Sequence, residues 1–147
     1  MNDSPVDLAE LVTDGRLRPQ PPDPVALAKV LEAADDDLRA ATKIVTTSPS
    51  WAEAMLYEAG LRAARVIVQA AGFRIAADRG HVTAVGAADA LTGGVHHRRF
   101  LRLHRLRRVR HSFICEVGRA PSEVDLDLAR RGVEAILVVA RSSLSEL

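Results

Sequence analysis

The sequence predicts a small all-α protein, an up-and-down bundle of four to five helices. Its 147 residues are close to the usual length of one domain, so a second full domain is not expected. Apolar residues make up 48% of the chain and aromatic residues only 3%, so Ala, Leu and Val must build the core, which suits packed helices better than a sheet. Apolar residues also recur at helical spacing between capping signals along most of the chain.

The N-terminal end of the chain differs from the rest. We expect residues 1–21 to form a flexible N-terminal arm, either mobile or packed on a neighbour, and residues 22–147 to form the bundle. The arm holds one short helical pattern over 6–12, followed by a segment rich in glycine and proline over 15–22.

Capping signals place the first two helices of the bundle. Asp23 is a favourable N-cap, and the proline after it fits the first position of a helix over 24–43. A Thr-Thr-Ser-Pro sequence then breaks the chain. Ser50 and Glu53 form a capping-box pattern for a second helix over 51–71, whose alanine-rich stripe permits close helix packing.

Three more helices are expected in the second half of the chain. A helix over 81–91 ends at a Gly-Gly pair, and a long basic helix follows over 95–116. The last helix spans about 121–143, and Ser122 with Asp125 forms a second capping-box pattern at its start. Valine pairs in this last segment also suit a strand, but the cap and the helical spacing favour a helix.

Charge is strongly segregated, although the formal net charge is only +1. No Asp or Glu occurs over 90–115, whereas the N-terminal third is acidic and includes an Asp-Asp-Asp run. Such a split favours an anionic partner for the basic segment, or pairing between the two parts within or between subunits. Four arginines of the basic helix are interpreted as a solvated face or as partners of the acidic third: Arg98, Arg99, Arg105 and Arg108.

A helical wheel separates the remaining basic residues of this helix. Its apolar stripe consists of Leu103, Leu106, Val109, Phe113, Ile114 and Val117. Arg110 falls inside the stripe, and so does Arg102 nearer the helix start, where its side chain reaches solvent easily. A buried arginine is costly unless it is paired or faces a cleft or a subunit interface. We therefore expect Arg110 either to face such a cleft or to form a buried ion pair.

A second line beside the stripe suits phosphate chemistry. It contains His104, Arg107, His111 and Cys115, spaced by three and four residues. An arginine in such a line neutralises phosphate charge, and a histidine moves a proton near neutral pH. A zinc site in this line matches known ligand spacings poorly, so we expect no metal and no cofactor.

The other features are those of a cytoplasmic protein without membrane contact. Cys115 is the single cysteine, so no intrachain disulfide forms, and the acidic N-terminus does not resemble a secretory signal. His81 is interpreted as a local capping or packing residue. Trp51 and Tyr57 are interpreted as core residues or as anchors of a dimer.

Several segments resemble HEPN domains (higher eukaryotes and prokaryotes nucleotide-binding), especially the small actinobacterial ones. The resemblance covers roughly residues 23–144. It rests on Arg107-Arg108-Val109-Arg110-His111, on Pro121-Ser122-Glu123 opening a last helix, on the alanine-rich AGLRAARVIVQAAGFR, and on the helix start at Gly80-His81. The family implies a bundle of four to five helices that dimerises through the helices bearing the motif.

The resemblance also implies a function. Active members are metal-independent endoribonucleases, some of toxin or defence type, with an arginine, a neighbouring polar residue and a later histidine meeting across a homodimer. Arg110 and His111 match the first two positions and are the expected catalytic residues, with Arg102, His104, Arg107 and Arg108 as RNA-binding residues. Where the family has its final histidine, this chain has Cys115, Glu116 and Val117.

Three interpretations therefore stay open. The first is a dimer that binds RNA or a nucleotide in a basic cleft, with or without ribonuclease activity. The second is a catalytically silent module that binds a cognate protein partner. The third is a regulator with a small-ligand pocket between the helices over 51–71, 95–116 and 121–143.

Overall fold

The computed structural model describes residues 6–77, 79–115 and 120–147, and for residues 107–115 it describes the backbone alone. The elements of the described chain, in order, are α1 (Leu8–Thr13), β1 (Leu17–Pro19), α2 (Pro24–Ile44), α3 (Pro49–Ala70), β2 (Phe73–Ile75), α4 (Gly80–Leu91), α5 (His97–Cys115) and α6 (Glu123–Ser145).

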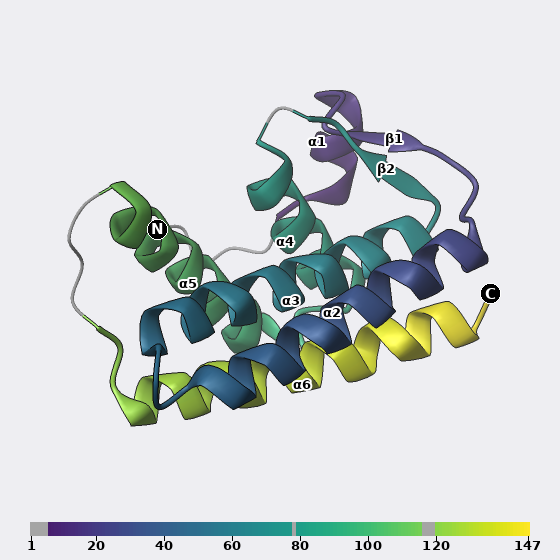
Figure 1. Ribbon diagram of the computed structural model, residues 1–147. Helices are drawn as coiled ribbons and strands as arrows, with labels where there is room; N and C mark the ends of the chain where they lie inside the picture. The colour runs from purple at the N-terminus through teal and green to yellow at the C-terminus, as the bar shows by residue number, and fades with distance from the viewer. Residues whose placement is uncertain (1–5, 78, 116–119) are drawn as a thin grey trace.

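The elements form a helical bundle around α3. This helix packs against α2, α4, α5 and α6, while α2, α3 and α6 run side by side along the molecule (Figure 1). The predicted all-α class is confirmed. The short helix expected near residues 6–12 is also present, as α1. Of the described helices, none is long and apolar enough to cross a membrane.

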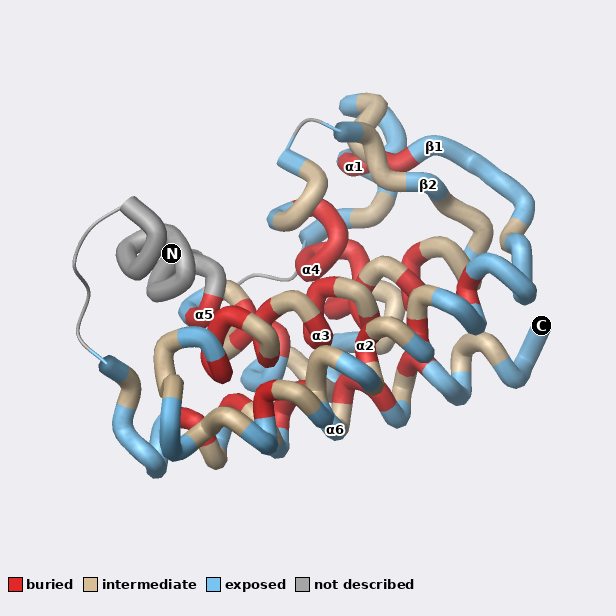
Figure 2. Tube along the Cα trace, in the orientation of Figure 1, coloured by how far each residue is buried: buried red, intermediate tan, exposed pale blue. Residues whose placement is uncertain are grey.

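The core lies on the faces that α3 turns toward its neighbours (Figure 2). Small residues dominate these faces of α3 and allow the neighbouring helices to approach it closely. A Cβ atom added at Gly60 would lie only 2.6 Å from Cδ1 of Leu103 on α5. Leu103 and Leu106 are buried as the wheel predicts, and Phe100 joins them with 1% of its surface exposed. Tyr57 is a core residue, whereas Trp51 is 53% exposed.

The N-terminal segment packs on α4 (Figure 1). Leu11 and Leu17 belong to the core, and β1 pairs antiparallel with β2, with Leu17 opposite Ile75. The residues from 6 onward of the expected N-terminal arm are thus part of the packed molecule. The sheet was not predicted, because strands of three residues carry too little alternation to be recognised.

Of the three N-caps predicted from the sequence, two are confirmed. Asp23 accepts a hydrogen bond from the backbone N–H of Ala26 at 3.2 Å, and Ser122 accepts one from that of Asp125 at 3.1 Å. The capping box at Ser50 is wrong. Helix α3 begins at Pro49, because proline fits the first helical position, and Glu53 is a buried side chain within the helix instead of a cap.

Candidate functional site

The acidic residues of α2 have partners outside the basic helix. Asp35 pairs with Arg141 of α6, and Oδ2 of Asp37 lies 3.0 Å from Nε of Arg62 on α3. These ion pairs join α2 to its neighbours in the bundle. In the described part of the chain, the acidic third therefore does not neutralise α5.

The arginines in the described part of α5 have no acidic partner among the described residues. No carboxylate lies within ion-pair distance of Arg98, Arg99, Arg102 or Arg105 among the described residues. Arg98, Arg99 and Arg105 are exposed, as expected for a solvated face. Positive charge in the first turn of a helix opposes the helix dipole, so Arg98 and Arg99 do not serve the stability of α5. Their charge is available to an external anion.

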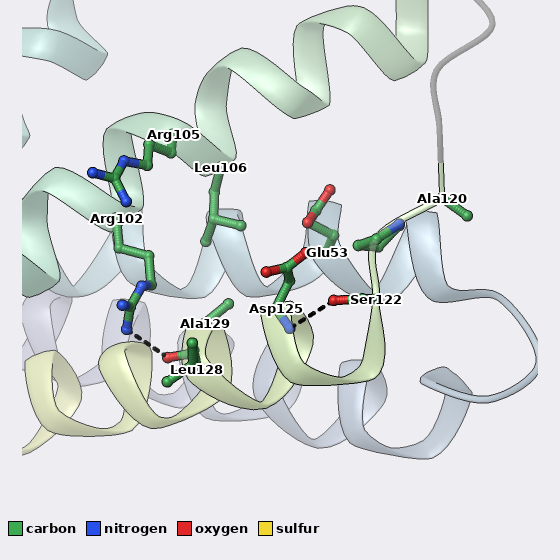
Figure 3. A pocket seen from close by; sticks show the side chains of 10 residues that line it. Glu53, Arg102, Arg105, Leu106, Ala120, Ser122, Asp125, Leu128 and Ala129 are labelled. Carbon is green, nitrogen blue, oxygen red and sulfur yellow. Dashed lines mark hydrogen bonds between the residues drawn. The ribbon is translucent and has the colours of Figure 1, made fainter.

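A pocket of about 680 Å³ opens beside these arginines, between α3, α5 and the start of α6 (Figure 3). Its size falls in the range of ligand-binding pockets. It lies between the three helices that the third interpretation of the sequence named. The pocket is lined by Glu53, Arg102, Arg105, Leu106, Ala120, Pro121, Ser122, Asp125, Leu128 and Ala129.

Two arginines, one helical turn apart, form one end of the pocket. Nη1 of Arg102 donates a hydrogen bond of 3.4 Å to the carbonyl oxygen of Leu128, which anchors its side chain on α6. A guanidinium carries five N–H donors, so most of those on Arg102 and Arg105 remain available to a ligand. Two such groups at one pocket end match the oxygens of a phosphate or a carboxylate.

Two carboxyl groups line the pocket away from the arginines, in the middle of the view in Figure 3. Glu53 is only 6% exposed, and its side chain points into the pocket beside Asp125. Burial, and secondarily the negative charge of Asp125, raise the pKa of Glu53 from 4.5 to about 7. Near neutral pH Glu53 is therefore present both as a neutral acid and as a carboxylate. A group in this state either donates or accepts a hydrogen bond and is able to exchange a proton.

The predicted site residues are only partly within the described structure. Arg102 lines the pocket, and His104 lies on the same helix, half-buried. The side chains of Arg107, Arg108, Arg110 and His111 lie outside the described residues, as does that of Cys115. The backbone places all five on α5, C-terminal to the arginines that line the pocket.

Sequence reasoning missed the acidic side of the pocket. It placed Glu53 and Asp125 in capping boxes, where short polar residues near helix starts are common. The signal for Glu53 was nevertheless present, because it lies one helical turn before the buried Tyr57 and thus on the same face. The wheel that singled out Arg110 would also have found a charged residue on the buried face of α3.

Two histidine contacts stabilise the surroundings of the site. Nδ1 of His97 lies 2.5 Å from Oδ2 of Asp89, which ties the start of α5 to the end of α4. His81 Nδ1 lies 2.8 Å from the hydroxyl of Tyr57, in agreement with its interpretation as a packing residue. Among the side chains that the structure describes, no group of three or more His, Cys, Asp or Glu is arranged to hold a metal ion.

Comparisons with known proteins add no relative to this description: no family model matches the chain, and no match is found among the curated proteins or the solved structures. The geometry of the pocket and of α5 is therefore the basis for the function proposed next.

Proposed function

We propose that this protein binds the phosphate groups of a nucleotide or of RNA through α5 and the adjoining pocket. The observation that carries the proposal is the set of arginines on α5 that have no carboxylate partner in the described chain, two of which line a pocket of nucleotide size. Elsewhere in the molecule, described arginines such as Arg62 and Arg141 are paired.

Electrostatics favours a phosphate over a neutral ligand at this end of the pocket. Hydrogen bonds between charged groups are about twice as strong as neutral ones, and guanidinium forks match phosphate oxygens. The hydrogen bond to the Leu128 carbonyl directs the Arg102 side chain along α6, at the edge of the pocket. The exposed Arg98 and Arg99 extend the same helix away from the pocket and suit the continuing backbone of a single strand.

Salt-titrated binding tests this proposal. The ligands are a labelled single-stranded RNA and a nucleoside monophosphate, and the variant is Arg102→Ala/Arg105→Ala. The control is Arg18→Ala/Arg74→Ala, which removes the same charge from two exposed arginines that face each other across β1 and β2, away from the pocket (Figure 1). Each lost phosphate contact should flatten the plot of log affinity against log salt by about 0.7 for a single strand.

The expected result is a flattening by about 1.4 in the pocket variant and a smaller change in the control. If both double variants flatten the plot equally, the ligand responds to the overall positive charge of the protein and not to a binding site at Arg102 and Arg105. If the wild type has negligible affinity for both ligands at low salt, the proposal fails, and the interpretation as a module that binds a protein partner is favoured.

The resemblance to HEPN domains extends the proposal to a homodimer with ribonuclease activity. In that version Arg110 stabilises phosphoryl charge while a 2′-hydroxyl attacks the adjacent phosphodiester, and His111 is the acid or base. Incubation of mixed RNA with the wild type and with Arg110→Ala tests the chemistry, and sedimentation equilibrium tests the dimer. Equal cleavage by both proteins, or cleavage by neither, would remove the catalytic version and leave the binding function.

A further inference from the structure

We propose that Glu53 and Asp125 form a base-recognition side of the pocket and that the ligand preferred there is a guanine nucleotide. This inference rests on the proposed function, because it takes the phosphate to lie at Arg102 and Arg105. It adds the identity of the base, which the arginines do not determine.

The Glu53 side chain is buried and lacks a hydrogen-bond donor among the described residues. It is 6% exposed, points into the pocket, and receives no hydrogen bond from the described residues. Carboxyl groups of residues buried to this degree are normally hydrogen-bonded. A ligand that donates hydrogen bonds at this position would supply the missing partner.

The pocket lining is basic on one side and acidic on the other. Arginines on one side and carboxyl groups on the other call for a ligand that is anionic at one end and a hydrogen-bond donor at the other. A nucleoside monophosphate has this polarity. The pocket volume of about 680 Å³ also accommodates a single nucleotide with associated water.

The carboxylate of Glu53 favours one base over the others. An ionised carboxylate is a pure acceptor with two oxygens. Guanine alone among the RNA bases offers two adjacent strong donors on its Watson–Crick edge, the ring N1–H and the 2-amino group. Adenine offers one donor beside an acceptor, which matches a neutral carboxylic acid instead. Guanine should therefore be preferred when Glu53 is ionised, and adenine should gain when Glu53 is protonated.

The preference for guanine over adenine should therefore change with pH as Glu53 is protonated, and a residue with only a structural role would not cause this change. Its pKa is raised to about 7, so its charge changes within an accessible range. The described charged groups that line the same pocket are Asp125 from α6 and Arg102 and Arg105 from α5. Asp125 is the one that raises this pKa by its charge. Replacing it with asparagine should move the change in selectivity to lower pH.

Isothermal titration calorimetry with GMP and AMP tests the inference. Both ligands carry the same phosphate, so the ratio of their affinities cancels phosphate titration. At about pH 8.5 the wild type should bind GMP about tenfold more tightly than AMP, since a bidentate pair of hydrogen bonds discriminates between bases. At about pH 6 most of this preference should be lost, as Glu53 becomes neutral. IMP, which keeps N1–H and lacks the 2-amino group, should bind between the two.

Variants separate the inference from the function on which it rests. Glu53→Gln should bind both nucleotides with a ratio that no longer depends on pH, while the matched control Glu32→Gln, on the exposed side of α2, should behave as the wild type. Equal affinity of the wild type for GMP and AMP at both pH values would overturn the guanine assignment and leave phosphate binding intact. Absence of binding by any nucleotide would overturn this inference, and the proposed function would fail with it only if the single-stranded RNA is not bound either.

Discussion

Replacing Glu53 by glutamine should stabilise the protein above neutral pH, even though the change removes a charged residue. The pKa of Glu53 is raised from 4.5 to about 7 in the folded chain, so the folded state binds this proton more tightly than the unfolded state. Folding is therefore weakened as the pH rises from 4.5 to about 7, and the loss is complete above that range. At about 1.4 kcal/mol per pKa unit, the interval corresponds to about 3 kcal/mol of unfolding free energy.

Urea unfolding followed by circular dichroism, at about pH 4 and about pH 8.5, measures this effect. Glutamine keeps the shape of the side chain and stays neutral, so the stability difference between variant and wild type should grow by about 3 kcal/mol between the two conditions. A constant offset from the new amide group would not affect this comparison. The exposed Glu32→Gln variant should show no such growth. A difference for Glu53→Gln that is independent of pH would refute the argument that this carboxyl is held in an unfavourable environment.

Three further changes test the packing that holds the site. Gly132→Ala should raise the unfolding free energy by about 0.5–1 kcal/mol, because a Cβ atom there meets nothing within 4 Å. Gly60→Ala should lower it by about 1 kcal/mol, because the added Cβ atom clashes with Leu103 on α5. Thermal denaturation of the two variants compares them directly. Asp23→Ala should cost about 1 kcal/mol of stability in urea unfolding through loss of the α2 cap, and an unchanged value would mean that the cap does not contribute. His97→Ala should cost about 1–3 kcal/mol, because the buried Asp89 loses its hydrogen-bond partner, and hydrogen exchange should be faster where α4 ends.

Local signals in the sequence were sufficient for most of the helices. Asp23 and Ser122 are N-caps as predicted, because their short polar side chains reach the free N–H groups of the first turn. The start of α3 was misplaced, because two signals competed there. The capping-box pattern at Ser50 overlapped the proline before it, and the preference of proline for the first position determined the start.

The pocket depends on contacts that no local pattern contains. Arg102 was predicted to take part in the site, and it lines the pocket. Its neighbour Arg105 was assigned to a solvated face or to pairing with the acidic third. Arg105 is exposed, but neither assignment reveals that the start of α6 lies beside it. The meeting of Glu53 with Asp125 joins residues of two helices far apart in the sequence. Only the arrangement of α3 against α6 brings their carboxyl groups together.

A crystal structure of the protein bound to GMP tests the central claim most directly. The phosphate is predicted to lie at Arg102 and Arg105, with the Watson–Crick edge of guanine on the carboxyl group of Glu53. A nucleotide bound at another surface, or one turned so that its base contacts the arginines and its phosphate faces solvent, would contradict the account.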